Sequence, residues 1–215
     1  MPTFQGTLRA RSLTTSYWTG SISVEFVDHG ETIEALKEQG LREVPDGENR
    51  IGLALDDSDS VVHLHLLYGE STCTPHEGAD VVQVEKDQLP DALEHVFHKL
   101  HLSQVILMPV GKWRKVFDAV AFSLADNEEW QAVDTAATVV LNTRDPLVVG
   151  PGDFHTINAL IKALLNDAEH PDQGLLITTT MAPLLVEIVP DAAIRVSIGN
   201  PVLADEVVET FGSTR

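Results

Sequence analysis

The sequence predicts an α+β fold in which amphipathic helices pack on antiparallel sheets of hairpins and a meander. Segments with strand-like alternation are joined by short connections, and connections of two to five residues cannot form parallel crossovers. Consecutive strands are therefore expected to pair as antiparallel neighbours. Between them lie segments whose apolar residues recur at helical spacing, which favours an α+β fold over a doubly wound parallel sheet.

In the first half of the chain these patterns predict four strands and two helices. The expected strands are residues 21–27, 51–55, 61–68 and 81–85, and the expected helices are residues 31–39 and the segment that follows Asp87. The second of these helices has the clearer pattern, because its apolar residues from Leu89 to Leu100 share one face. Pro45, Asp46 and Gly47 predict a turn between the first helix and the second strand.

The second half of the chain is patterned more strongly. The expected strands are residues 105–108, 138–141, 147–149, 175–179, 184–189 and 194–198, and the expected helices are residues 113–124, 154–168 and 201–211. From residue 105 the order is therefore β-α-β-β-α-β-β-β-α. From residue 112 this order of elements is similar to that of roadblock-type dimerisation domains, and the resemblance implies that a sheet edge or helix face pairs with another copy.

The chain divides near Ser103 and Gln104 into two α+β halves, residues 1–103 and 104–215. A length of 215 residues suits one large domain or two small ones. No Pro- or Gly-rich linker separates the halves. We therefore expect them to pack closely or to form one continuous domain.

The charge of the chain excludes several classes of partner. The sequence has 14 Lys and Arg against 33 Asp and Glu, a net charge of −19, and the acidic residues are spread over both halves. Nucleic acids and anionic membranes bind through basic side chains, so neither is expected as a partner. Lys112, Arg114 and Lys115 form a small basic cluster, which the helical pattern predicts to be a solvated helix face.

The sequence also predicts a soluble protein of the cytoplasm. The N-terminal residues have no apolar signal core, and no apolar run approaches the roughly 18 residues of a membrane span. A single cysteine cannot form an internal disulfide framework, which suits a reducing compartment.

The best candidate for a metal site lies in residues 63–80. His63 and His65 project to the same side of the expected strand, and Cys73 and His76 follow in a loop. These four side chains offer the nitrogen and sulfur ligands that Zn²⁺ or another divalent transition metal prefers. Their spacing matches no common zinc motif, and the competing interpretation places the two histidines on a semi-exposed sheet face. We favour the second interpretation.

No catalytic or cofactor motif stands out elsewhere. The sequence has no Gly-x-Ser-x-Gly elbow, no phosphate-binding loop and no dinucleotide fingerprint. The prediction is therefore a non-catalytic binding or assembly module without a cofactor, which associates with itself or with another protein. The alternative is a small metal-dependent enzyme with a site centred on His63 and His65.

Overall fold

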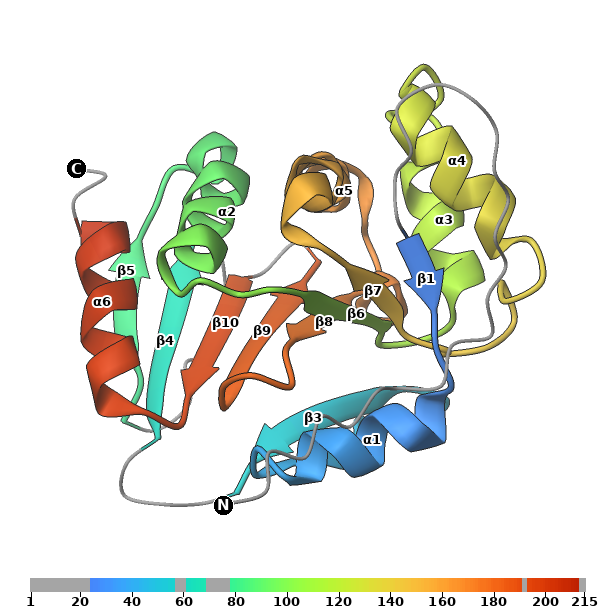
Figure 1. Ribbon diagram of the computed structural model, residues 1–215. Helices are drawn as coiled ribbons and strands as arrows, with labels where there is room; N and C mark the ends of the chain where they lie inside the picture. The colour runs from blue at the N-terminus through green and yellow to red at the C-terminus, as the bar shows by residue number, and fades with distance from the viewer. Residues whose placement is uncertain (1–23, 57–60, 69–77, 191–192, 213–215) are drawn as a thin grey trace.

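The computed structural model describes residues 24–56, 61–68, 78–190 and 193–212. An eight-stranded sheet forms the centre of the molecule, with helices on one face and a smaller layer of one helix and a β-hairpin on the other (Figure 1). This arrangement confirms the predicted α+β class.

The central sheet combines strands from both ends of the sequence. Its strands are β1 (Val24–Phe26), β4 (Val62–Leu67), β5 (Asp80–Gln83), β6 (Val105–Pro109), β7 (Leu147–Val149), β8 (Leu175–Thr178), β9 (Leu184–Val189) and β10 (Ala193–Ile198). They lie in the order β1-β7-β6-β8-β9-β10-β4-β5. β8, β9 and β10 form the predicted meander, and β10 then pairs with β4 from the first half of the chain.

The helices and the hairpin form the outer layers. The helices are α1 (His29–Lys37), α2 (Leu89–Lys99), α3 (Trp113–Val120), α4 (Glu128–Ala137), α5 (Phe154–Asp167) and α6 (Pro201–Gly212). The hairpin joins β2 (Leu41–Pro45) to β3 (Ile51–Leu55). Its turn contains Gly47 and Asn49 at φ values of 85° and 60°, a conformation that glycine and asparagine tolerate better than most residues.

Alternation along the strands sends side chains into two separate cores. Leu64, Leu66, Val186, Ile194 and Val196 point toward α2–α6 and are fully buried. On the second face, residues of β6, β8 and β9 pack against α1 and the hairpin; this smaller core contains Leu36, Leu41, Ile51, Leu53, Ile106, Met108, Val110, Leu176 and Leu185. The second layer thus packs on the middle of the sheet.

The expected strand at residues 138–141 is wrong. Asn127 caps α4 by accepting a hydrogen bond from the Trp130 N–H at 2.8 Å, and the chain after the helix continues in turns. The Val140 N–H donates to the Ala137 carbonyl and the Thr143 N–H donates to the Val140 carbonyl. The β-branched residues here resemble a strand, but local turn bonds determine the backbone. The element order consequently departs from the roadblock-type order.

The sheet is mixed rather than wholly antiparallel. β5 pairs in parallel with β4, with His65 opposite Val81. This pairing contradicts the expectation that consecutive strands are antiparallel. The twelve residues between β4 and β5 are too many for a hairpin turn and are long enough for a parallel connection. β2 was also not predicted, since Leu41–Pro45 does not alternate clearly and ends in proline. Within the described ranges, no helix is long and apolar enough to cross a membrane.

Candidate functional site

A row of polar side chains crosses β9, β10 and β4 on the second face of the sheet. Arg195 of β10 lies opposite Glu187 of β9 on one side and opposite His65 of β4 on the other. Ser197 lies opposite His63, and the Ser197 Oγ is 2.9 Å from the His63 Nδ1. The alternation that buries the apolar residues under the helices therefore brings these groups together.

Burial dominates the electrostatics of Glu187. Loss of water raises the pKa of this carboxyl above its ordinary value, although the positive charge of Arg195 acts in the opposite direction. The carboxylate of Asp46, in the hairpin turn, raises the pKa of Glu187 further. Glu187 is thus a largely desolvated carboxyl within electrostatic reach of the hairpin turn.

The histidines predicted as metal ligands occupy this row. His65 is only 1% exposed, so the predicted semi-exposed position is wrong for this residue. On its strand, His65 lies opposite Arg195 of β10 on one side and opposite Val81 of β5 on the other. Cys73 and His76 lie outside the described residues. Among the residues that are described, no three His, Cys, Asp or Glu side chains are arranged to hold a metal ion, and the four-residue metal site stays a prediction.

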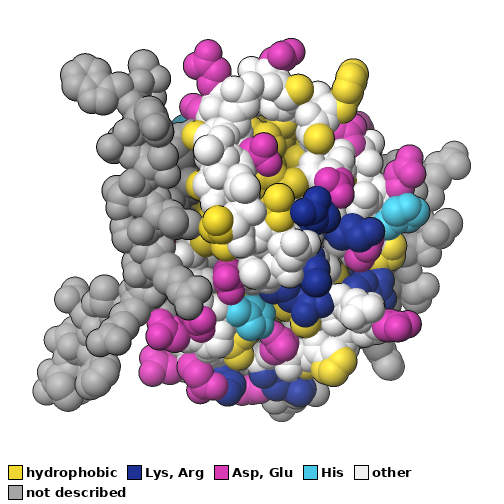
Figure 2. Space-filling view, turned by 90° about the vertical axis from the view of Figure 1, so that its right-hand side faces the viewer, with side chains coloured by type: hydrophobic (Ala, Val, Ile, Leu, Met, Phe, Trp, Pro, Cys, Tyr) yellow, Lys and Arg dark blue, Asp and Glu magenta, His cyan; other side chains and the backbone are white. Residues whose placement is uncertain are grey.

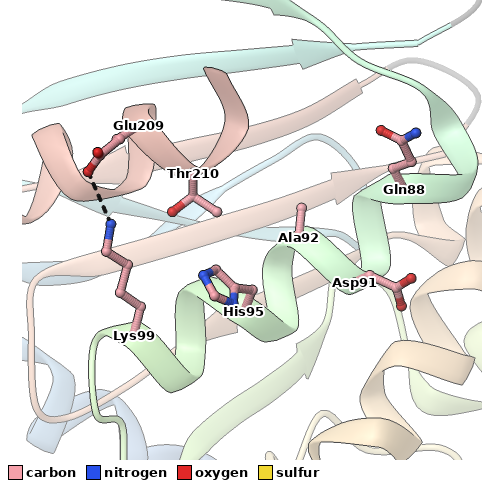
Figure 3. Close-up of a pocket in the computed structure, with 7 residues that line it drawn as sticks. All are labelled: Gln88, Asp91, Ala92, His95, Lys99, Glu209 and Thr210. Carbon is pink, nitrogen blue, oxygen red and sulfur yellow. Dashed lines mark hydrogen bonds and ion pairs between the residues drawn. The ribbon is translucent and has the colours of Figure 1, made fainter. Parts of the chain in front are cut away.

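A groove of about 450 Å³ lies between α2 and α6. His95 and Lys99 of α2 face Thr210 and Glu209 of α6 across it (Figure 3). The Lys99 Nζ lies 3.4 Å from the Glu209 Oε2, and it also donates to the backbone carbonyl of Glu206. These contacts join the two helices, so the groove is better explained by helix packing than by ligand binding.

A second cleft, of about 600 Å³, has a different character. Its lining comes from three segments: the hairpin turn, the junction between β6 and α3, and the short 3₁₀ helix Pro171–Gln173 before β8. Arg50, Lys112 and Lys115 line it together with Glu48 and Asp172, and we call this site the basic cleft. Lys and Arg side chains gather near the middle of the face seen in Figure 2, although the chain as a whole is acidic.

The walls of the basic cleft are held together by Arg144. The Arg144 Nε donates to the Gly111 carbonyl at 2.7 Å, and the Nη2 donates to the Asn49 carbonyl. Gly111 in turn lies so close to the neighbouring wall that a Cβ would come within 2.5 Å of the Asp172 carbonyl oxygen. The hairpin turn, the β6–α3 junction and the 3₁₀ helix are therefore fixed relative to one another.

The cations of the basic cleft are only partly neutralised. The Lys115 Nζ lies 3.5 Å from the Asp172 Oδ2, and the Arg50 Nε lies 3.6 Å from the Asp46 Oδ2. In the described part of the chain, neither Lys112 nor Arg144 has a carboxylate within 4 Å. The sequence indicated only the local cluster around Lys112, because nothing in the linear pattern connects it with Arg50 or Arg144.

The outer edge of β5 is a further exposed feature. β5 is the last strand of the sheet, and no other described strand pairs with its outer side. Val81 in this strand is 51% exposed. Two exposed apolar residues, Val202 and Val208, lie on α6 at the same end of the molecule (Figure 1).

Comparison of the chain with protein-family models, curated proteins and solved structures found no match.

Proposed function

We propose that this protein is a non-catalytic binding module that associates with a second copy of itself through the edge of strand β5. The observation that supports this proposal is the combination of an edge strand with an exposed apolar side chain, Val81, at its centre. An open edge offers backbone N–H and carbonyl groups to another strand, and apolar side chains beside it add burial to the contact.

The backbone geometry of β5 suits such pairing. The Val84 N–H donates to the Leu67 carbonyl of β4 at 2.9 Å. Since successive N–H groups of a strand point to opposite sides, the Val81 N–H points away from β4. Two copies of β5 related by a two-fold axis would pair antiparallel, and each would present the same surface to the other.

The charge of the chain makes the association sensitive to salt. Two copies with a net charge of −19 repel each other, and salt screens this repulsion while leaving backbone pairing and apolar burial in place. Self-association through β5 is therefore expected to strengthen as the salt concentration rises.

Sedimentation velocity of the wild type and two lysine variants tests the proposal. Val81→Lys places a charge on the edge and is expected to give a monomer under conditions in which the wild type is a dimer. Val139→Lys adds the same charge at another exposed valine, after α4, and is expected to leave the dimer intact. A wild type that stays monomeric at every protein and salt concentration would contradict the proposal, as would equal effects of the two variants.

A further inference from the structure

We propose that the basic cleft binds a phosphate group, either as the free anion or as the ester of a small molecule that carries hydroxyl groups. This site is separate from the β5 edge and does not depend on self-association. Its case rests on the convergence of positive charge, on the rigidity of its walls and on the kind of acceptor groups beside the cations.

Positive charge converges here from parts of the chain that are far apart in sequence. Arg50 comes from the hairpin, Lys112 from the residue before α3 and Lys115 from its first turn. Arg144, from the connection between α4 and β7, bridges two of the walls through backbone carbonyls. Three cations against two carboxylates in the lining give this cleft a local excess of positive charge in a chain with 33 carboxylates and 14 Lys and Arg. Because the Debye length is roughly 8 Å at physiological salt, an anion beside these cations responds to them more than to the carboxylates outside the cleft.

The cleft is built before any ligand arrives. Arg144 bridges the Gly111 and Asn49 carbonyls, and Gly111 allows the backbone at Asp172 to approach closely. Lys115 and Arg50 are oriented by Asp172 and Asp46. Rigid walls reduce the ordering cost of binding, so a small ligand with few contacts can still bind.

The lining also indicates the class of anion. Several Lys and Arg donors that approach from different sides suit a compact, multiply charged group with several oxygen atoms, as in phosphate. Glu48 and Asp172 also line the cleft and would repel an anion that filled it. Their carboxylate oxygens can instead accept hydrogen bonds from hydroxyl groups. This favours a ligand whose phosphate lies at the cations and whose hydroxyl groups lie beside the two carboxylates.

Calorimetric titration with three probes tests the inference. Inorganic phosphate and glycerol 3-phosphate are expected to bind the wild type, and glycerol is not. Tighter binding of glycerol 3-phosphate would assign the ester as the ligand class, and equal or tighter binding of inorganic phosphate would assign the free anion. Binding of either is expected to weaken as NaCl is added, which is the opposite of the salt dependence expected for self-association through β5.

Two alanine variants locate the site. Lys112→Ala removes an exposed cation that has no carboxylate partner in the described part of the chain, and is expected to weaken phosphate binding at least about tenfold without lowering the melting temperature of the unliganded protein. Lys162→Ala removes an exposed lysine of α5 outside the cleft and is expected to leave affinity unchanged. Failure of the wild type to bind both phosphate probes would overturn the inference. Equal affinity of Lys112→Ala and the wild type would do the same.

Discussion

Arg195 of β10 lies directly opposite Glu187 of β9 on two central strands, and the positive charge of Arg195 acts to lower the pKa of the Glu187 carboxyl. The attraction between them does not compensate for the loss of water, because burial is the larger effect on the Glu187 pKa and raises it. Two half-buried opposite charges of this kind contribute little net stability, since desolvation offsets the attraction between them. The pair nevertheless gives the fold a measurable dependence on pH.

Mild acid should stabilise the wild type relative to Glu187→Gln. A carboxyl whose pKa is higher in the folded state than in the unfolded state binds its proton more readily when folded, so its contribution to stability rises as pH falls from neutral toward the ordinary value of 4.5. Glutamine cannot titrate and serves as the matched control. Urea unfolding of both proteins at neutral and mildly acidic pH measures the difference, and an unchanged difference in unfolding free energy would show that Glu187 does not titrate as the structure indicates.

Arg144 should contribute more to stability than a neighbouring surface arginine. Arg144→Ala removes two hydrogen bonds that join the hairpin turn to the β6–α3 junction, and we expect a loss of about 1–3 kcal/mol in unfolding free energy. Arg114→Ala removes one long, exposed contact with the Asn142 side chain and should cost less than about 0.5 kcal/mol. Chemical denaturation compares them, and similar losses for both would argue against a role for Arg144 in holding the cleft walls.

A methyl group at Gly111 should disrupt the same region. In Gly111→Ala the new Cβ would meet the Asp172 carbonyl oxygen at 2.5 Å, and the backbone would have to move, at a cost of about 1–3 kcal/mol. Gly150→Ala is the control, since nothing lies within 4 Å of the corresponding Cβ position. Thermal unfolding should show a lower melting temperature for the first variant only. A Gly111→Ala variant as stable as wild type would mean that the two walls are not in such close contact.

His65 should matter for stability whether or not a metal is present. The side chain is buried, so His65→Ala is expected to cost about 1–3 kcal/mol, whereas His95→Ala on the exposed side of α2 should cost less than about 0.5 kcal/mol. We expect a chelator to leave the loss of unfolding free energy in each of the two variants unchanged. Elemental analysis of protein purified without a histidine tag completes the test: stoichiometric zinc in the wild type that disappears in His65→Ala would favour the metal-dependent alternative.

The sequence predicted the fold correctly where the pattern of apolar residues along a segment matches the side chains that are buried in the structure. The meander of β8–β10 follows from short, strongly apolar segments separated by tight turns. The core face of β4 follows in the same way, because Leu64 and Leu66 alternate with the two histidines. At residues 138–141 the local pattern was misleading, since β-branched residues continued a helix end through turns. The stripe of Trp130, Val133 and Ala137 was the helical signal that could have indicated α4.

The surroundings of the candidate sites depend on contacts between segments that are far apart in the sequence, and the pattern within a single segment does not predict these contacts. His65 is buried and its strand pairs in parallel with β5, and neither fact can be inferred from the alternation of the two strands. The basic cleft likewise exists because the hairpin turn lies against the β6–α3 junction, where the Ile51 N–H donates to the Val110 carbonyl at 2.9 Å. A linear sequence places Arg50, Lys112 and Arg144 in three unrelated segments.

The backbone amide of Val81 gives the most direct test of self-association through β5. Its N–H points away from β4, so pairing with a second copy should slow its exchange with solvent deuterium as the protein concentration rises. NMR exchange measurements at several concentrations, with the Val84 amide as an internal reference already bonded to β4, provide the comparison. We predict protection of the amide at position 81 that grows with concentration and is absent in the Val81→Lys variant, in which a charge on the edge opposes pairing. Exchange of the Val81 amide at a rate independent of concentration would contradict the proposed assembly.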